Sequence, residues 1–247
     1  MPSKAMEYKG MLVQRPKKKM GKADHGWLQS NFHFSFAEYY NPHNIHFGVL
    51  RVLNDDTIQP QSGFPTHPHR DMEIITYIIS GELTHKDSMG NEERLGEGEV
   101  QYMSAGTGIT HSEYNLHPDK TLKLLQIWIF PPEKNIEPLY GSYRFAKKDA
   151  HNTLLNIVSS QTGDAPIKIF QDVKIFISRL DKDRDFELIL NQNRQIYFVL
   201  IEGSAEINGL IVQEGDGLEI VDEPQLIIKA LSNAHFLFIE MPSSHEH

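Results

Sequence analysis

The sequence predicts an all-β protein built from two similar antiparallel barrels, with little helix. Two observations lead to this prediction. Short segments rich in β-branched and aromatic residues recur at near-regular spacing along the chain of 247 residues, with glycine turns between them. The order of these segments and turns in the first half is then repeated in the second half. Helical periodicity is scarce, and residues 151–159 are the best helical candidate.

The first half is expected to fold as a series of short strands. Phe32, Phe34 and Phe36 alternate with polar residues, a pattern that predicts a strand with one aromatic face. The predicted strands lie within residues 26–40, 47–53, 72–79, 83–87, 100–103 and 122–130. The predicted turns lie at residues 54–56, 88–91 and 96–98, where asparagine, aspartate and glycine gather.

The second half repeats the pattern of the first. Residues 197–203 resemble residues 76–81, an apolar strand that ends in a glycine. Residues 214–217 resemble the glycine turn at 96–99. The proline-rich and charged segment 131–138 has the composition of a domain boundary. We therefore predict a first barrel over residues 1–132, a linker over residues 133–140 and a second barrel over residues 141–247.

The composition excludes several classes of protein. The chain has no cysteine, which rules out disulfide frameworks, thiolate metal sites and a cysteine nucleophile. The formal net charge of −9 argues against a nucleic-acid partner. No apolar run is long enough to span a membrane, and the N-terminus lacks the apolar core of a signal peptide. We expect a cytoplasmic monomer without membrane or nucleic-acid partners.

Two pairs of potential metal ligands stand out in the first half. His67 and His69 are separated by one residue, and so are His111 and Glu113. In a β-strand, residues i and i+2 point to the same face, so each pair would point together. If the two strands face each other, three imidazoles and one carboxylate converge. The second half has no such pair at the corresponding place, residues 186–194, so a metal is expected in the first barrel alone.

This ligand set suits a divalent transition metal with open coordination positions. Three nitrogens and one oxygen without sulfur are compatible with Fe(II), Mn, Co, Ni, Cu(II) or Zn. Pro68 cannot donate to a β-ladder, so its strand is expected at a sheet edge or at an irregularity. Glu73 lies four residues after His69 and is either a fifth ligand or an acceptor for an imidazole N–H.

These residues resemble the two motifs of the cupin superfamily, and within it the pirin family. The first motif is similar to Gly63, His67, His69, Glu73 and Gly81. The second motif is similar to Gly98, Gly106, His111 and Asn115, with Ser104 in place of the usual proline. Residues 67–73, 87–91 and 103–109 look like pirins of the bacterial quercetin 2,3-dioxygenase type. The specific resemblance covers most of residues 23–132, and beyond them it concerns the architecture only.

The resemblance implies a bicupin, in which two double-stranded β-helix barrels pack face to face. It implies one divalent metal held by His67, His69, His111 and Glu113, with Glu73 outside the ligand set as a second-layer acceptor. We expect Fe(II) first, with Mn, Co, Ni, Cu or Zn as alternatives.

The resemblance also implies an activity, the opening of the heterocyclic ring of a quercetin-like flavonol with O2. Glu113 would be the base that takes the substrate's hydroxyl proton. Phe47 and Phe64 are expected to stack on the flat substrate. The alternatives are a redox- or metal-sensing regulatory pirin that binds a protein partner, and a cupin that acts on a different small molecule.

Overall fold

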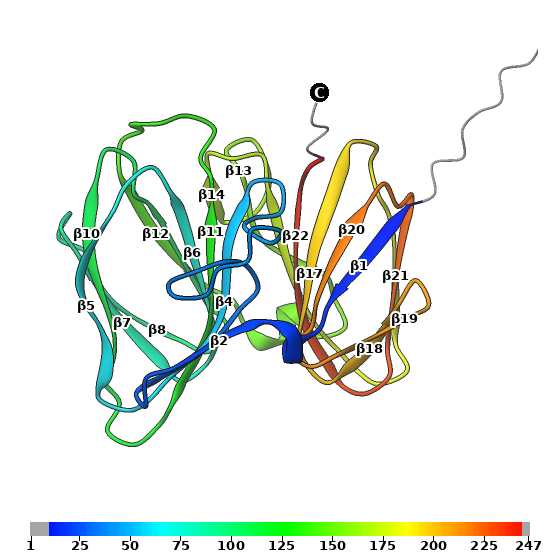
Figure 1. Cartoon of the computed structure of the whole chain (residues 1–247), viewed down its shortest axis with the longest axis horizontal. Helices are drawn as coiled ribbons and strands as arrows, with labels where there is room; N and C mark the ends of the chain where they lie inside the picture. The colour runs from blue at the N-terminus through cyan, green and yellow to red at the C-terminus, as the bar shows by residue number, and fades with distance from the viewer. Residues whose placement is uncertain (1–9, 244–247) are drawn as a thin grey trace, which may run out of the picture.

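The structure is a computed structural model that describes residues 10–243, and these residues form two β-barrels side by side (Figure 1). Each barrel consists of a seven-stranded and a four-stranded sheet of the described chain. The large sheet of the first barrel has the order β12 (Leu139–Arg144), β9 (Glu99–Ser104), β6 (Glu73–Ser80), β11 (Leu122–Ile129), β4 (Leu50–Ile58), β3 (Leu28–Phe32) and β2 (Gly21–Asp24). Its small sheet has the order β5 (Ser62–His69), β10 (Ile109–Asn115), β7 (Glu82–Asp87) and β8 (Glu92–Gly96).

The second barrel repeats this arrangement. Its large sheet has the order β1 (Met11–Arg15), β20 (Gly217–Val221), β17 (Arg194–Glu202), β22 (Ala234–Pro242), β15 (Lys174–Leu180), β13 (Leu155–Ser160) and β14 (Ile167–Ile169). Its small sheet has the order β16 (Asp185–Ile189), β21 (Gln225–Ala230), β18 (Ser204–Ile207) and β19 (Leu210–Gln213). The predicted pair of all-β barrels is therefore confirmed. The helices of the described chain are the short 3-10 turns η1 (Lys17–Lys19) and η2 (Lys147–Ala150).

The two barrels pack against each other through their large sheets. The largest hydrophobic core contains side chains of both halves, such as Tyr77 and Ile127 from the first barrel and Val199 and Ile239 from the second. Separate cores fill the interior of each barrel. The Tyr77 hydroxyl lies 2.9 Å from His235 Nε2 across the contact. Burying one face of each large sheet in a shared core explains why the two barrels form one body.

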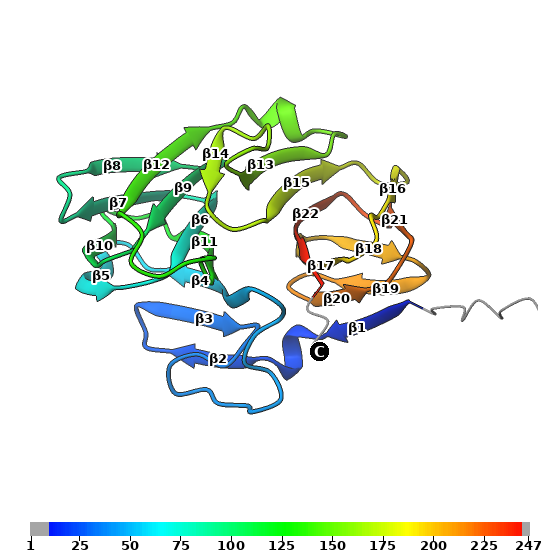
Figure 2. The same cartoon turned by 90° about the horizontal axis from the view of Figure 1, so that it is seen from above.

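Each barrel receives one strand from the other half of the chain. β1 pairs with β20 of the second barrel, and the chain then crosses to β2 and β3 of the first (Figure 2). β12 pairs with β9 of the first barrel, although it follows the proline-rich segment. The sheets therefore do not follow the division predicted at residues 133–140, because each edge is completed by a strand from beyond it. Lys17, Lys18 and Lys19 of η1 lie in this crossover.

Three local predictions were wrong. The helical candidate, residues 151–159, is mostly strand β13, because its apolar side chains complete the shared core beside β15. The turn expected at residues 54–56 lies inside β4. Asparagine and aspartate favour turns in general, but here Asn54 and Asp56 are buried inside the first barrel. The strand with one aromatic face expected at Phe32, Phe34 and Phe36 is absent, because strand β3 ends at Phe32 and the intervening His33 and Ser35 are buried as well.

Within residues 10–243, no helix has the length and apolar character needed to cross a membrane. The cytoplasmic location and the monomeric state remain predictions.

Candidate metal centre

Strands β5 and β10 bring three histidines together inside the first barrel. The strands pair antiparallel with His111 opposite His67, and Ile109 opposite His69. The ring centroid of His111 lies 4.4 Å from that of His67 and 4.8 Å from that of His69, and the two β5 rings are 4.8 Å apart. One ligand nitrogen from each ring lies within 4.8 Å of the others. Convergence of these imidazoles is what the i, i+2 spacing predicted.

The irregular backbone expected around Pro68 is present. In the described sheet β5 is an edge strand, as Pro68 predicted. The pairing with β10 also shifts register between His111 and Glu113, because Glu113 lies opposite Phe64 and not opposite residue 65. A β-bulge of this kind re-aims neighbouring side chains. Gly63 makes the close approach possible, since a Cβ there would collide with the Glu113 carbonyl.

The nitrogens of the histidine cluster are prepared to bind a cation. His67 Nδ1 lies 2.8 Å from the Pro65 carbonyl oxygen, which favours a proton on Nδ1 and a free lone pair on Nε2. His111 is 1% exposed, and neither of its nitrogens has a hydrogen-bond partner among the described residues. Buried polar atoms are rarely left in this condition. A bound metal ion would supply the missing partner, so the residues fit the expected metal.

The electrostatic environment keeps the imidazoles neutral, as metal ligation requires. Burial, followed by the charge of His67, lowers the pKa of His69 from 6.5 to about 4. The same two causes, in the same order, lower the pKa of His111 to about 2, with smaller effects from His69 and His85. Both rings therefore present lone pairs at neutral pH.

Glu113 lies beside His111, on the side of the histidine cluster that faces His85. Glu113 is 3% exposed, and its carboxylate accepts hydrogen bonds of 3.3 and 3.0 Å from Gln126 Nε2. Its ligand oxygen groups with His111 and with His85, and not with His67 and His69. Burial raises the pKa of Glu113 to about 7, against the opposing hydrogen bonds from Gln126 and Thr76. The carboxyl can therefore exchange a proton near neutral pH.

His85 is a buried member of the site that the sequence reasoning missed. It lies on β7 directly opposite Glu113, and its ring is stacked on Tyr140 at 4.8 Å. Its Nδ1 lies 3.0 Å from Gln101 Nε2, and its Nε2 lies 3.4 Å from Asp87 Oδ2. The sequence did contain a signal for this position. His85 follows Leu83 by two residues, so both side chains point to the same face of β7, and both are buried. Its proximity to Glu113 depends on the pairing of β7 with β10, two strands that are distant in the sequence.

Glu73 does not have the role expected of it, and this prediction was wrong. Its buried carboxylate accepts hydrogen bonds from the Tyr102 hydroxyl (2.9 Å), the Phe170 N–H (2.6 Å) and the Gln171 N–H (2.9 Å). Among residues 10–243 it accepts none from an imidazole. Glu73 instead holds a loop of the second half against β6. The motif spacing could not show this, because the two N–H donors, Phe170 and Gln171, lie almost a hundred residues further along the chain.

A cavity of about 300 Å³ opens beside the histidines. That size is at the lower end of the range for small-molecule pockets. Phe64 lines it, as expected, and packs edge to face against Trp27 with ring centroids 5.1 Å apart. Phe47 was expected there but packs into the core between the barrels, 5.8 Å from the Tyr197 ring, so that prediction was wrong. The lining residues are Ala23, His25, Trp27, Leu28, Ser30, Phe32, Phe36, Ala37, Asn54, Asp56, Phe64, His67, His69, Glu113, Gln126 and Trp128.

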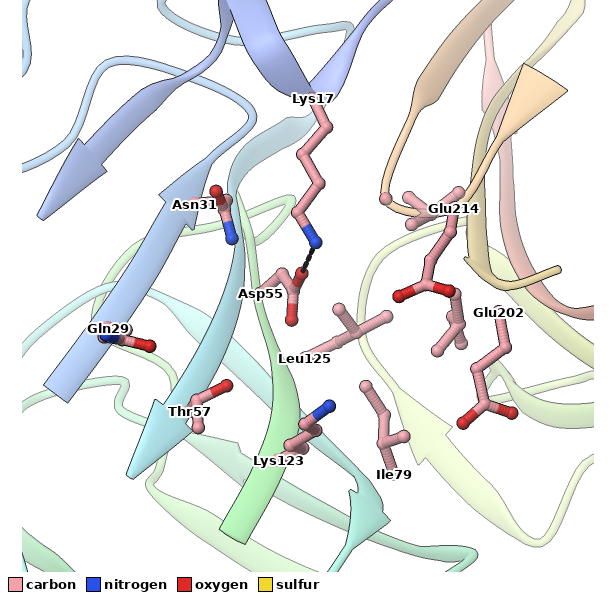
Figure 3. Close-up of a pocket in the computed structure, with 13 residues that line it drawn as sticks. Lys17, Gln29, Asn31, Asp55, Thr57, Ile79, Lys123, Leu125, Glu202 and Glu214 are labelled. Carbon is pink, nitrogen blue, oxygen red and sulfur yellow. Dashed lines mark ion pairs between the residues drawn. The ribbon is translucent and has the colours of Figure 1, made fainter. Parts of the chain in front are cut away.

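A second cavity, of about 440 Å³, lies between the two barrels (Figure 3). Lys17 of the crossover reaches into it and pairs with Asp55 of β4 at 3.4 Å. Glu202 and Glu214 point into it from the second barrel (Figure 3). Its lining is polar and of mixed charge, which suits a solvated junction between domains better than a site for an aromatic compound.

The fold and the site have counterparts among known proteins. The family described as Pirin matches residues 13–129, and the quercetinase C-terminal cupin domain matches residues 156–241. A protein of Escherichia coli named quercetin 2,3-dioxygenase is 42% identical, over 94% of this chain and 99% of its own length. A pirin-like protein of Caulobacter vibrioides is also 42% identical, over 93% of this chain and 99% of its own.

A solved structure shows the same similarity in three dimensions. It is the bacterial pirin YhhW of Escherichia coli in complex with nickel(II), which has a TM-score of 0.89 to this chain at 41% identity. The match covers 94% of this chain and 100% of that one.

Proposed function

The chain belongs to the pirin family, and from this premise we propose that it is a metal-dependent dioxygenase that opens the heterocyclic ring of a flavonol. The names of the relatives support an oxygen-using activity. The observation that carries the proposal is the junction of a three-histidine cluster with an aromatic-lined cavity. Such a cavity suits a flat, apolar compound whose polar edge faces the histidines.

We propose that His67, His69, His111 and Glu113 hold the metal. The deep burial of His111 and Glu113 and the converging β5 imidazoles support this set. Fe(II) is the expected ion, and the nickel complex of the relative makes Ni(II) the first alternative to test. When bound, the metal supplies a Lewis acid that polarises substrate oxygens and a place where dioxygen can meet the substrate.

The chain's own residues supply the base and the orientation. Glu113 takes the proton of the flavonol 3-hydroxyl on a carboxylate oxygen, since this side chain lines the cavity together with His67 and His69. Gln126 donates hydrogen bonds to both oxygens of Glu113. These bonds fix the orientation of the carboxylate in the lining of the cavity. Trp27, Phe64 and Trp128 hold the rings of the substrate flat and exclude water.

The test is an assay of the metal-loaded protein with quercetin, started without oxygen and then exposed to air. Loss of flavonol absorbance on aeration is expected, with His111→Ala as the inactive control. If no metal among Fe, Mn, Ni, Co and Cu gives loss above that control, the proposed activity is wrong.

The alternative functions differ in what they would show in the same preparation. A cupin that acts on another small molecule would bind metal but leave quercetin unchanged, and a substrate screen would follow. A metal-sensing regulator would capture a protein partner in a manner that depends on Fe(II) or Fe(III). Identical binding by the metal-free protein and by both oxidation states would remove the regulator.

A further inference from the structure

The cavity has a second polar end, away from the histidines, and we propose that Asp56 and Asn54 recognise a hydroxyl group of the substrate there. This inference rests on the proposed function, because it takes the cavity to be the substrate site. It goes further by defining the substrate class: a flat aromatic compound with a metal-binding edge and at least one additional hydroxyl group.

Asn54 and Asp56 share one face of strand β4. They are separated by one residue, so both side chains point into the first barrel, and both line the cavity with His67, His69 and Glu113. Asn54 is 3% exposed and Asp56 is 4% exposed. Asp55, between them, points to the opposite face and lines the cavity between the barrels.

Both side chains have an oxygen that needs a donor. Asn54 Oδ1 and Asp56 Oδ1 are buried and have no hydrogen-bond partner within the described part of the chain. Leaving such an acceptor unsatisfied costs about 1–3 kcal/mol. Ser30 lies opposite Asp56 on β3, yet Asp56 Oδ1 has no hydrogen-bond partner among the residues that the structure describes.

The side chain opposite Asn54 on β11 is already used. Gln126 lies opposite Asn54 on β11, but its amide nitrogen donates to Glu113 and its oxygen accepts from the Thr76 hydroxyl at 2.7 Å. The remaining wall around the two acceptors is largely apolar, with Leu28 and Phe32 among its members. A donor for Asn54 and Asp56 can therefore come from a molecule in the cavity.

A phenolic hydroxyl is the donor that fits these surroundings. It is neutral, so it does not bring a charge into an apolar pocket, and it is carried by the flat ring that the aromatic walls accommodate. A site with buried acceptors discriminates strongly against an analogue that lacks the hydroxyl, because the acceptors are then left unpaired. Asp56 and Asn54 are thus specificity-determining residues and have no part in the proton transfer assigned to Glu113.

The protein carries its own reporter for this test. Its two tryptophans, Trp27 and Trp128, both line the cavity, so their fluorescence responds to occupancy. Zinc-loaded protein is titrated without oxygen with quercetin and with 3-hydroxyflavone, which keeps the metal-binding edge but has no other hydroxyl. We expect quercetin to bind at least about tenfold more tightly, which corresponds to about 1.4 kcal/mol.

Three variants separate recognition from folding. In Asp56→Leu the preference for quercetin should fall to near unity, because the acceptor is removed. Asp56→Asn retains an acceptor and should keep part of the preference. Asp55→Asn, the matched control on the opposite face of β4, should behave like the wild type. Thermal unfolding of Asp56→Leu is expected to show an unchanged or higher Tm, since it replaces an unpaired buried carboxyl by an apolar side chain.

The outcomes distinguish this inference from the proposed activity. Equal preferences in the wild type and Asp56→Leu would overturn the inference even if quercetin is turned over. A preference that Asp56→Leu abolishes would support it even if no flavonol is consumed on aeration, and the proposed reaction alone would then fail. If neither compound changes the fluorescence, no flavonol enters the cavity and both are overturned.

Discussion

The two barrels share one topology but differ in what fills their interiors. Corresponding positions can be assigned by counting from Gly81 and Gly203 and by following the strand registers. The four predicted ligands then correspond to apolar residues of the second barrel: His67 to Leu188, His69 to Leu190, His111 to Leu226 and Glu113 to Ile228. None of these second-barrel side chains can bind a metal.

The difference extends to the layer behind the ligands. The corresponding pairs are His85 and Ile207, Thr76 and Phe198, Gln101 and Leu218, Gln126 and Phe238, and Asn54 and Phe176. The second barrel shows that the fold does not need polar residues at these places. Because buried polar groups oppose folding unless they are paired, their concentration in the first barrel indicates a site and not a structural requirement.

The largest effect is expected when a histidine of the first barrel is replaced by the corresponding residue of the second. His111→Leu installs the side chain of the second barrel, Leu226, in the first. We expect the bound metal to fall to background and quercetin turnover to disappear, while the fold is retained because a leucine is accommodated at the corresponding place. Metal analysis and circular dichroism check this. A variant that keeps its metal would show that His111 is not a ligand.

Glu113→Gln distinguishes the contribution of the carboxylate from that of the three imidazoles. The amide has nearly the same shape but cannot accept a proton, so turnover should fall by about 100-fold or more. Metal content should fall less than in His111→Leu, because three imidazoles remain. Steady-state kinetics with metal analysis on the same sample measure both. Unchanged turnover per bound metal would contradict the role of Glu113 as base.

The buried carboxyls should make the first barrel sensitive to pH when no metal is present. Burial raises the pKa of Asp56 to about 7, with Asp55 and Glu113 adding to it and Ser30 opposing it, and Glu113 reaches about 7 as well. Both groups ionise near pH 4 in an unfolded chain. The folded state holds their protons to higher pH, so the contribution of these two carboxyls to the free energy of unfolding should fall as pH rises from about 4 to about 7. His69 and His111 act in the opposite direction below about pH 6.5, because their pKa values are lowered in the fold. The effect of Asp56 is therefore measured against Asp56→Leu, which keeps the histidines.

Urea unfolding followed by tryptophan fluorescence measures this effect selectively, because Trp27 and Trp128 both lie in the first barrel. Relative to Asp56→Leu, the wild type should lose a few kcal/mol over this range, since one pKa unit is worth about 1.4 kcal/mol. A difference between the two proteins that is constant or rises over this range would show that Asp56 is not held protonated by the fold.

The smallest expected effect is on the KM for quercetin, and it should differ between variants of Phe64 and Phe47. Phe64→Leu trims the wall of the cavity and should raise the KM for quercetin about three- to tenfold, the range expected for one aromatic contact. Phe47→Leu alters the core between the barrels and should leave the KM unchanged while lowering the stability by about 1 kcal/mol. Equal effects of both variants on the KM would mean that the cavity is not the substrate site.

The sequence predicted what depends on local periodicity. The i, i+2 spacing brought His67, His69 and His111 together, and Pro68 indicated an edge strand, because both follow from the geometry of a strand. The repeat of strand and glycine turn predicted two barrels.

The features that the sequence did not reveal depend on pairing between distant segments. His85 joins the site through the register of β7 with β10, and Glu73 leaves it because loop amides of the second half approach its carboxylate. Asn54 and Asp56 have the composition of a turn, yet the cavity uses them within a strand. Phe47 could not be assigned to either side of its sheet without the packing of the two barrels.

The exchange of β1 and β12 between the barrels gives the chain the connectivity of a strand-swapped dimer joined into one polypeptide. A fragment ending near residue 132 would lack β12 and expose the long edge of β9, and the remaining fragment would lack β1 at β20. Unpaired edges of this kind promote aggregation. Each half therefore supplies the edge strand that the other half needs. If the chain is split into these two pieces, we expect the metal centre to form only when both pieces are produced together.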